Sequence, residues 1–174
     1  RLMAGSRGGQ HGDLDADGKP DVVVTNDAGS TVSVFKNNST PGSVIFATMV
    51  DLTAGTRPYS VTIGDLDGDT KPDLAVASNS VNVVSLFKNN SPAGTIAFGT
   101  KVDFATGAAP TSVVIDDLDG DGKPDLAVSN SLSATVSILR NTISVTTAPI
   151  IISFNPTSGA VGTSVTITGT NFSP

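Results

Sequence analysis

The chain has no cysteine, no glutamate and no tryptophan, and only one histidine and one tyrosine among its 174 residues. Without cysteine it forms no disulfide and carries no thiol chemistry. The shortage of aromatic side chains leaves Val, Ile and Leu to build the core, and such residues favour strands over helices. No apolar run reaches the 18 residues of a membrane span, and Arg1 to Gln10 lack the apolar stretch of a signal peptide. We therefore expect an all-β protein without membrane insertion.

The acidic residues are all aspartate, and twelve of the sixteen lie in three copies of one nine-residue loop. The copies recur every 52 residues and occupy residues 13–21, 65–73 and 117–125. Simple polar turns would explain one Asp-Gly pair, but not three matched sets of four carboxylates. Three divalent cations would balance the formal net charge of −6. The net acidity also argues against nucleic acid as a partner.

Each loop has Asp at positions 1, 3, 5 and 9, which is oxygen-ligand spacing for calcium. Magnesium fits less well because it keeps its waters and needs a tighter octahedron. We predict about three calcium ions with a structural role, held by four Asp side chains per loop and the backbone carbonyl of the Lys at position 7. The predicted ligands are Asp13, Asp15, Asp17, Lys19 and Asp21; Asp65, Asp67, Asp69, Lys71 and Asp73; and Asp117, Asp119, Asp121, Lys123 and Asp125.

Position 6 of the loop needs a sharp backbone turn, which glycine permits at positive φ. Gly18 and Gly122 meet this need, whereas the second loop has Thr70 at the same position. We therefore expect the second site to be strained and to bind calcium more weakly than the other two.

The 52-residue similarity extends beyond the loops to the segments around them. Alternating and apolar patterns predict up to four short antiparallel strands per unit, with Gly, Pro, Asn and Ser in the turns. No strand is expected in Arg1 to Gln10, before the first loop. The predicted strands are 58–64 and 110–116; 21–25, 73–77 and 125–129; 31–35, 83–87 and 135–139; and 45–51 and 96–104. Four strands in such a unit is the pattern of a β-propeller blade, which must stack on neighbours to bury its faces.

The text Gly64-Asp65-Leu66-Asp67-Gly68-Asp69, continued by Lys71-Pro72-Asp73-Leu74-Ala75-Val76-Ala77, resembles the FG-GAP/VCBS repeat family. The resemblance covers residues 11–142 and implies calcium-loop blades like those of integrin-α-type propellers. The tail from Pro149 resembles the opening of an IPT/TIG domain, an immunoglobulin-like sandwich of which only about a quarter would be present. We expect a partial β-propeller-like array in residues 1–145 and a truncated immunoglobulin-like β segment in residues 146–174, with a boundary near residue 145.

No residue outside the loops indicates catalysis. His11 is expected to be an ordinary turn residue, and every close Asp pair falls inside a predicted metal loop. Asn-x-Ser/Thr patterns occur in three segments, at residues 37–40, 89–91 and 171–173, and match glycan acceptors but arise readily in Asn- and Ser-rich turns. The sequence therefore predicts a protein that is not an enzyme.

The first functional expectation is an extracellular calcium-binding module with a structural, adhesive or scaffolding role, because cytosolic calcium is too scarce to fill modest sites. The first alternative is a self-assembling surface filament or adhesin subunit that neighbouring chains complete. The second is a non-catalytic region of a larger secreted polysaccharide-active enzyme. Expected partners are other copies of the chain or the remainder of a larger one, with a glycan or a surface protein as ligand.

Overall fold

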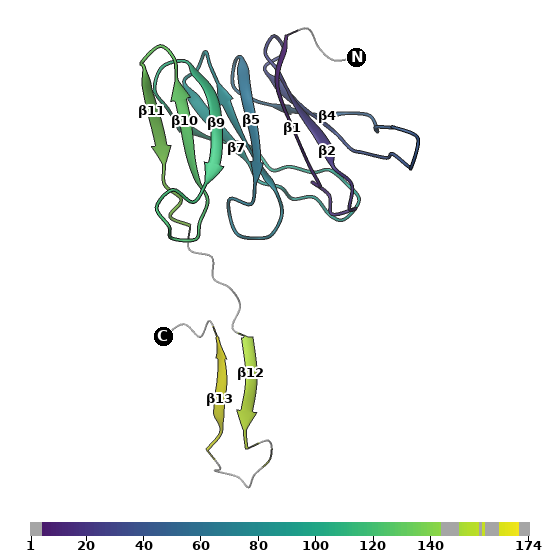
Figure 1. Cartoon of the computed structure of the whole chain (residues 1–174), viewed down its shortest axis with the longest axis vertical. Coiled ribbons are helices and arrows are strands. Elements are labelled where there is room, and N and C mark those ends of the chain that lie inside the picture. Colours follow the sequence, from purple (N-terminus) through teal and green to yellow (C-terminus); the bar gives the residue numbers. More distant parts are fainter. Residues whose placement is uncertain (1–4, 144–149, 157, 159–163, 171–174) are drawn as a thin grey trace. The chain divides into compact units, whose positions relative to one another are not determined.

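The computed structural model describes residues 5–143, 150–156, 158 and 164–170 (Figure 1). These residues form thirteen β-strands and no helix, so the prediction of an all-β protein is confirmed. The chain divides into two compact units, Arg1–Thr142 and Ile143–Pro174. The predicted boundary near residue 145 lies outside the described residues. Within the described part of the chain, no helix is long and apolar enough to cross a membrane.

The first unit consists of three antiparallel sheets that follow one another along the chain, one for each 52-residue repeat. In each sheet, strands that are consecutive in sequence are also neighbours in space. The first sheet comprises β1 (Ser6–Gly12), β2 (Asp21–Asn26), β3 (Thr31–Phe35) and β4 (Val50–Thr53). The second comprises β5 (Pro58–Gly64), β6 (Asp73–Ser78), β7 (Val83–Phe87) and β8 (Val102–Ala105). The third comprises β9 (Pro110–Asp116), β10 (Asp125–Asn130) and β11 (Thr135–Leu139).

Most of the predicted strands are present in the structure. Strands β3, β5, β7, β9 and β11 have the predicted bounds, and β2, β6 and β10 run one residue further than predicted. Short segments of alternating residues were sufficient to predict these strands, because the same pattern recurs at the same place in each repeat. The described residues of the first unit form three open sheets, and none of these closes on itself.

The prediction that no strand precedes the first loop was wrong. Strand β1 pairs with β2 over most of its length, with Gly9 opposite Val24 and Gly12 opposite Asp21. Its sequence shows little apolar alternation because its glycines allow a neighbouring sheet to approach. A Cβ atom at Gly8 would lie 2.9 Å from the carbonyl oxygen of Tyr59 on β5.

The position of the fourth strand was also predicted wrongly. The strands β4 and β8 begin at Val50 and Val102, several residues after the predicted starts at Ile45 and Ile96. The preceding apolar residues lie instead in two hairpins, which we call the first arm (residues 37–46) and the second arm (residues 89–98). Each arm is closed by an isolated bridge, Asn37 to Phe46 or Asn89 to Phe98. Ile96 and Phe98 are apolar because they pack against the core between two sheets.

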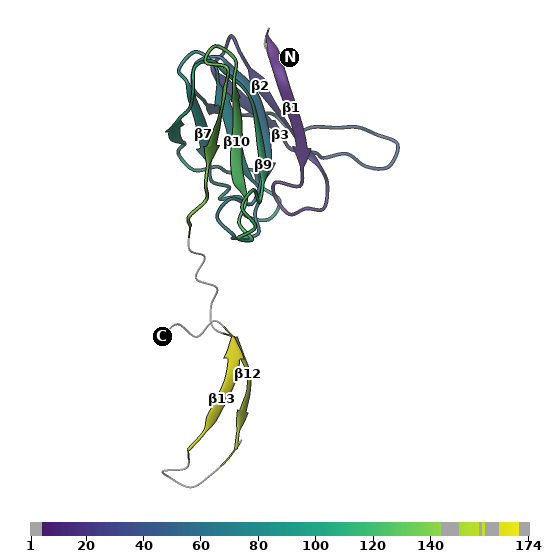
Figure 2. The same cartoon turned by 60° about the vertical axis from the view of Figure 1, so that its left-hand side comes forward.

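The sheets stack face to face through two aliphatic cores (Figure 2). Between the first and second sheets, Val23 and Val32 pack with Val61 and Leu74. Between the second and third sheets, the buried side chains are Ala75, Val84, Val113 and Val128. The middle sheet therefore contributes to both cores, and all six residues of its strand β6 are buried.

The second unit contains one antiparallel pair, β12 (Ile150–Asn155) and β13 (Thr166–Thr170). The two strands pair with Phe154 opposite Ile167 and Asn155 opposite Thr166. Two strands do not distinguish an immunoglobulin-like sandwich from other β folds, so that part of the prediction stays a prediction.

Candidate metal centres

The three acidic loops occupy the same place in the three sheets, between the first and second strands. The strands on either side of each loop pair up to its base, where Gly12, Gly64 and Asp116 lie opposite Asp21, Asp73 and Asp125. Positions 1 and 9 of each loop are therefore held close together by the end of a β-ladder. Because each copy of the loop sequence joins two strands that pair with each other, the chain reverses its direction at each of the three loops.

The ninth residue of each loop is a buried aspartate that binds backbone amides. In the first loop, the amide nitrogens of Leu14 and Asn37 donate to the two oxygens of Asp21 at 3.0 and 2.8 Å. Asp73 and Asp125 accept equivalent pairs of amides in the other two loops. Burial raises the pKa of Asp21 and of Asp73, because the charged carboxylate loses water, although the amide donors oppose the shift. This clamp at the base of the loop was not foreseen from the sequence.

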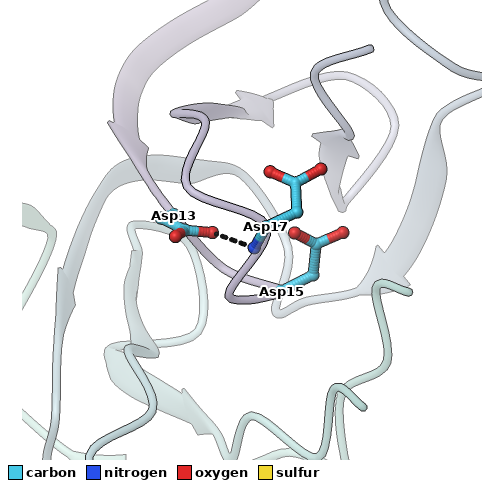
Figure 3. Close-up of side chains that lie close together, drawn as sticks. All are labelled: Asp13, Asp15 and Asp17. Atoms are coloured by element: carbon cyan, nitrogen blue, oxygen red, sulfur yellow. Dashed lines mark hydrogen bonds between the residues drawn. The ribbon is translucent and has the colours of Figure 1, made fainter. Parts of the chain in front are cut away.

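The first aspartate also organises its loop. Asp13 accepts a hydrogen bond from the amide of Asp17 at 3.1 Å (Figure 3). It accepts another from the amide of Gly18 at 2.9 Å, and the two bonds curl the chain around its carboxylate. The equivalent Asp65 and Asp117 each accept three such bonds.

The predicted left-handed backbone at position 6 is confirmed in all three loops. Gly18 and Gly122 have φ of 82° and 81°, and Thr70 is forced to 71°. A β-branched residue at positive φ is strained, at a cost of about 1–2 kcal/mol. Position 4 is left-handed as well, and there the first loop has Ala16 with φ of 57° where the other loops have glycine. The alignment of the three loops in the sequence already contained this second signal.

In every loop, three of the four predicted Asp side chains bring carboxylate oxygens within 4.8 Å of one another. The groups are Asp13, Asp15 and Asp17; Asp65, Asp67 and Asp73; and Asp117, Asp119 and Asp125. The remaining aspartate of each loop, which is Asp21, Asp69 or Asp121, does not belong to its group. The amides of Lys19, Lys71 and Lys123 donate to the aspartate two residues earlier, and the assignment of their carbonyls as ligands stays a prediction.

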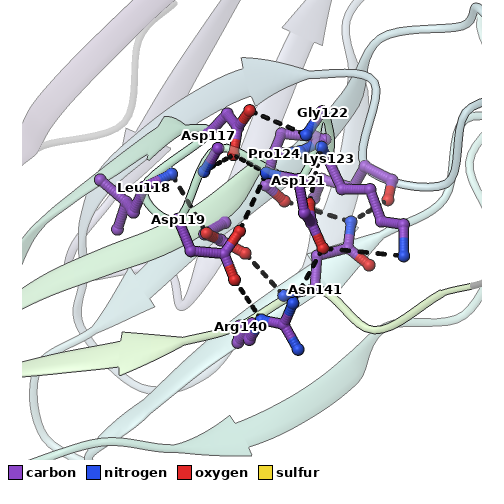
Figure 4. Close-up of polar contacts among 12 residues, drawn as sticks. Asp117, Leu118, Asp119, Asp121, Gly122, Lys123, Pro124, Arg140 and Asn141 are labelled. Carbon is purple, nitrogen blue, oxygen red and sulfur yellow. Dashed lines mark hydrogen bonds and ion pairs between the residues drawn. The ribbon is translucent and has the colours of Figure 1, made fainter.

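A basic side chain reaches each loop from the residue just after the third strand of the same sheet. Lys36 donates to Asp15 and Asp17, and Lys88 donates to Asp67 and Asp69. In the third repeat, Arg140 takes this place and donates to Asp119 and Asp121 (Figure 4). These residues are also spaced by 52 and could have been found from the period. Their hydrogen bonds lower the pKa of Asp17, Asp69 and Asp119, so these carboxylates stay ionised.

The residues present fit a hard cation. Each loop carries four Asp side chains, its own lysine and one basic group from the end of the third strand, which leaves the site negative, and all of the clustered side-chain donors are oxygens. Moreover, Asp15 is buried and its Oδ1 atom has no hydrogen-bond partner within the described part of the chain. A buried carboxylate oxygen without a partner is costly unless a cation or a donor reaches it. Calcium takes such oxygens in a flexible geometry.

The fold and these loops define a class of protein built from stacked β-repeats, each with one acidic turn. The model of the FG-GAP-like repeat matches residues 13–76 and 65–128, so the chain belongs to the FG-GAP-like repeat family. Among solved structures, the chain is similar to a functionally unknown protein from Desulfotomaculum acetoxidans DSM 771, with a TM-score of 0.50 and 21% identity. The similarity covers 80% of this chain and 42% of that protein, and it concerns the fold alone. The comparison with curated proteins gave no match.

Proposed function

We propose that the chain is a calcium-binding β-repeat module with a structural role, which works outside the cell in adhesion or as a scaffold. The observation that supports this most strongly is the convergence of carboxylate oxygens within 4.8 Å in all three loops, at equivalent places of three sheets. When bound, the ion supplies positive charge that offsets the repulsion among these carboxylates and so stabilises the turn between two strands.

The loop residues divide into two tasks in this proposal. The aspartates at positions 1 and 3 of every loop hold the ion, together with the aspartate at position 5 in the first loop and at position 9 in the other two. The remaining contacts of positions 1 and 9, to backbone amides, hold the loop in the shape that keeps these oxygens together. Lys36, Lys88 and Arg140 form ion pairs with the aspartates at positions 3 and 5 of their loops, so a divalent cation competes with them for these carboxylates.

The proposal also includes the absence of catalysis, an extracellular location and a larger assembly. The module has no catalysis of its own, because its close Asp pairs are held by backbone amides and basic side chains in the loops. An extracellular location supports filling of the sites, since free calcium is abundant there. The repeats would belong to a larger propeller-like assembly, and residues 146–174 would be the start of an immunoglobulin-like domain.

Calcium titration of the metal-free protein, followed by calorimetry and by thermal unfolding, tests the proposal. We expect about three ions per chain and a stabilisation of about 2.7 kcal/mol for each bound ion at a hundredfold excess of free ion over its Kd. Magnesium at the same concentration should stabilise the protein less.

The variant Asp67→Asn should lose one ion and leave the other two sites intact. Asp103→Asn is the matched control, because it removes the same charge from an edge strand outside the loops. A melting temperature that does not respond to calcium, or equal stoichiometry in Asp67→Asn and wild type, would contradict the proposal.

A further inference from the structure

The junction between consecutive repeats is built in the same way twice. The side-chain amide of Asn89 donates to the Pro72 carbonyl of its own loop and to the Leu14 carbonyl of the preceding loop, both at 2.9 Å. Asn141 does the same one repeat later, with Pro124 at 3.1 Å and Leu66 at 2.7 Å. Each junction thus ties the loop of one repeat to an asparagine of the next.

Burial at equivalent positions shows what each junction covers. The leucine at position 2 of the loop is 2% exposed in the first repeat and 7% in the second, but 49% at Leu118. On the third strand, Val84 is fully buried, whereas its equivalent Val136 is 63% exposed. Ile138 is exposed on the same strand. We call Leu118, Val136 and Ile138 the outer face of the third repeat.

The first repeat carries the opposite half of such a junction. Asn37 donates to the Pro20 carbonyl of its own loop at 2.8 Å, and no described loop precedes it. In the second arm, Ile96 and Phe98 pack against the first core. The equivalents in the first arm, Val44 and Phe46, are exposed, and the arm projects from the sheets in both views (Figures 1 and 2).

One further position distinguishes the two internal junctions from the exposed surfaces of the first and third repeats. At both internal junctions a glycine faces an isoleucine: Gly12 faces Ile63, and Gly64 faces Ile115, with a Cβ at Gly64 only 3.0 Å from the Ile115 side chain. The residue equivalent to the glycine in the third repeat is Asp116, and the residue equivalent to the isoleucine in the first repeat is His11. Both are exposed. A junction between these two ends would therefore bring a carboxylate to an imidazole.

We infer that the outer face of the third repeat binds the first repeat of a second copy of this chain, head to tail, in the geometry of the internal junctions. In this junction Asn37 of one copy donates to the Leu118 carbonyl of the other, the first arm covers Leu118, and His11 meets Asp116. Because the two surfaces differ, the contact is heterologous and adds copies in one direction. The inference goes beyond the proposed metal function, since it assigns a partner and a surface.

Sedimentation velocity over a concentration series, in saturating calcium, tests the inference with two variants of the whole chain. Ile138→Asp blocks the outer face, and Val44→Asp blocks the first arm, both at exposed positions where folding tolerates the change. We expect wild type to form species larger than a monomer and each variant alone to stay monomeric. An equal mixture should form a dimer and nothing larger, because Val44→Asp supplies the only intact outer face and Ile138→Asp supplies the only intact arm.

Leu132→Asp is the matched control, because Leu132 is exposed in the third repeat and its equivalent Ser80 is exposed even in the middle one. This variant should associate as wild type does. A monomeric wild type at several hundred micromolar, a dimer of Val44→Asp alone, or a monomeric mixture would each overturn the inference. Calcium binding to the monomeric Ile138→Asp variant, measured separately, shows whether the metal proposal holds independently.

Discussion

The second and third sheets have nearly the same sequence pattern but different surroundings. Strand β6 (Asp73–Ser78) and strand β10 (Asp125–Asn130) begin with the same Asp-Leu-Ala-Val, and both pair with the strands before and after them. Every residue of β6 is buried, whereas two of the six residues of β10 are not. Strand β7 has three buried residues and its equivalent β11 has none. The comparison teaches that the repeat sequence specifies a strand and its loop, while burial depends on whether another sheet covers each face.

The largest effect is expected when a charge is placed at equivalent positions of the second and third sheets. Val84→Asp puts an unpaired carboxylate between the second and third sheets and should cost at least about 3–5 kcal/mol. That is a large share of the about 5–15 kcal/mol that stabilises a typical domain. Val136→Asp should fold normally, because the side chain at this position is already exposed. Circular dichroism during thermal unfolding compares the two, and an equal loss of stability would show that the third sheet is covered after all.

The junction asparagines give the second test. Asn89→Ala removes the bonds to Pro72 and to Leu14 of the preceding loop in a fully buried place, while Asn37→Ala removes the bond to Pro20 and none to a second loop. Each variant also loses the bond that the asparagine Oδ1 accepts from the amide two residues later. We expect Asn89→Ala to destabilise the protein by about 1–3 kcal/mol more than Asn37→Ala, because a buried carbonyl loses its donor. Urea unfolding of both variants measures this difference. Equal values would mean that the bond between loops contributes nothing.

Backbone strain at position 6 differs among the three loops. Thr70→Gly relieves the positive-φ strain at position 6 of the second loop and should raise its calcium affinity about fivefold, which corresponds to about 1 kcal/mol. Gly122→Ala in the third loop should have the opposite effect, since a Cβ there meets no atom within 4 Å and changes only the backbone preference. Calorimetric titration checks both variants. Unchanged or lower affinity in Thr70→Gly would count against the strain argument.

The smallest effect is expected at an ion pair found only in the first junction. Asp27 accepts hydrogen bonds from Arg7 at 2.7 Å and from Arg57 at 3.0 Å, and these lower its pKa. At the same place in the second junction, the neutral Asn79 donates to the Pro110 carbonyl.

Because the folded-state pKa of Asp27 is depressed, its contribution to stability is present above the unfolded value of about 3.9 and disappears as the pH falls through the folded value. Asp27→Asn should therefore lose under about 1 kcal/mol at pH 7 and show a shallower decline of stability in acid. Denaturant unfolding from pH 7 to pH 3 tests this. A decline as steep as that of wild type would place the acid sensitivity elsewhere.

Parts of the fold that depend on local pattern were predictable, and parts that depend on neighbours were not. Eight strands followed from apolar alternation and the period, because backbone pairing within a repeat needs only local sequence. Strand β1 was missed since its glycines serve contact with another sheet, and such contact leaves no alternation behind. The apolar residues of the second arm were taken for a strand because Ile96 and Phe98 look the same whether they join a ladder or cover a core.

The residues of the candidate sites also divide into those that local sequence predicts and those that only strand pairing brings together. The aspartates and the demand for a left-handed residue at position 6 were visible in the sequence, because a tight turn constrains its own residues. Lys36, Lys88 and Arg140 lie about 20 residues from their carboxylates, and only the pairing of strands brings them there. The role of the ninth aspartate as a clamp likewise depends on amides that come from the loop and from the start of the arm.

The sequence by itself determined the all-β class, the 52-residue repeat and three acidic turns, because these depend on local pattern and local backbone demands. Only the tertiary structure decided which faces are covered and how an asparagine links one loop to the preceding one. Burial is a property of pairs of surfaces that meet in space, and identical stretches of sequence acquire different exposure when one has a neighbour and the other has none.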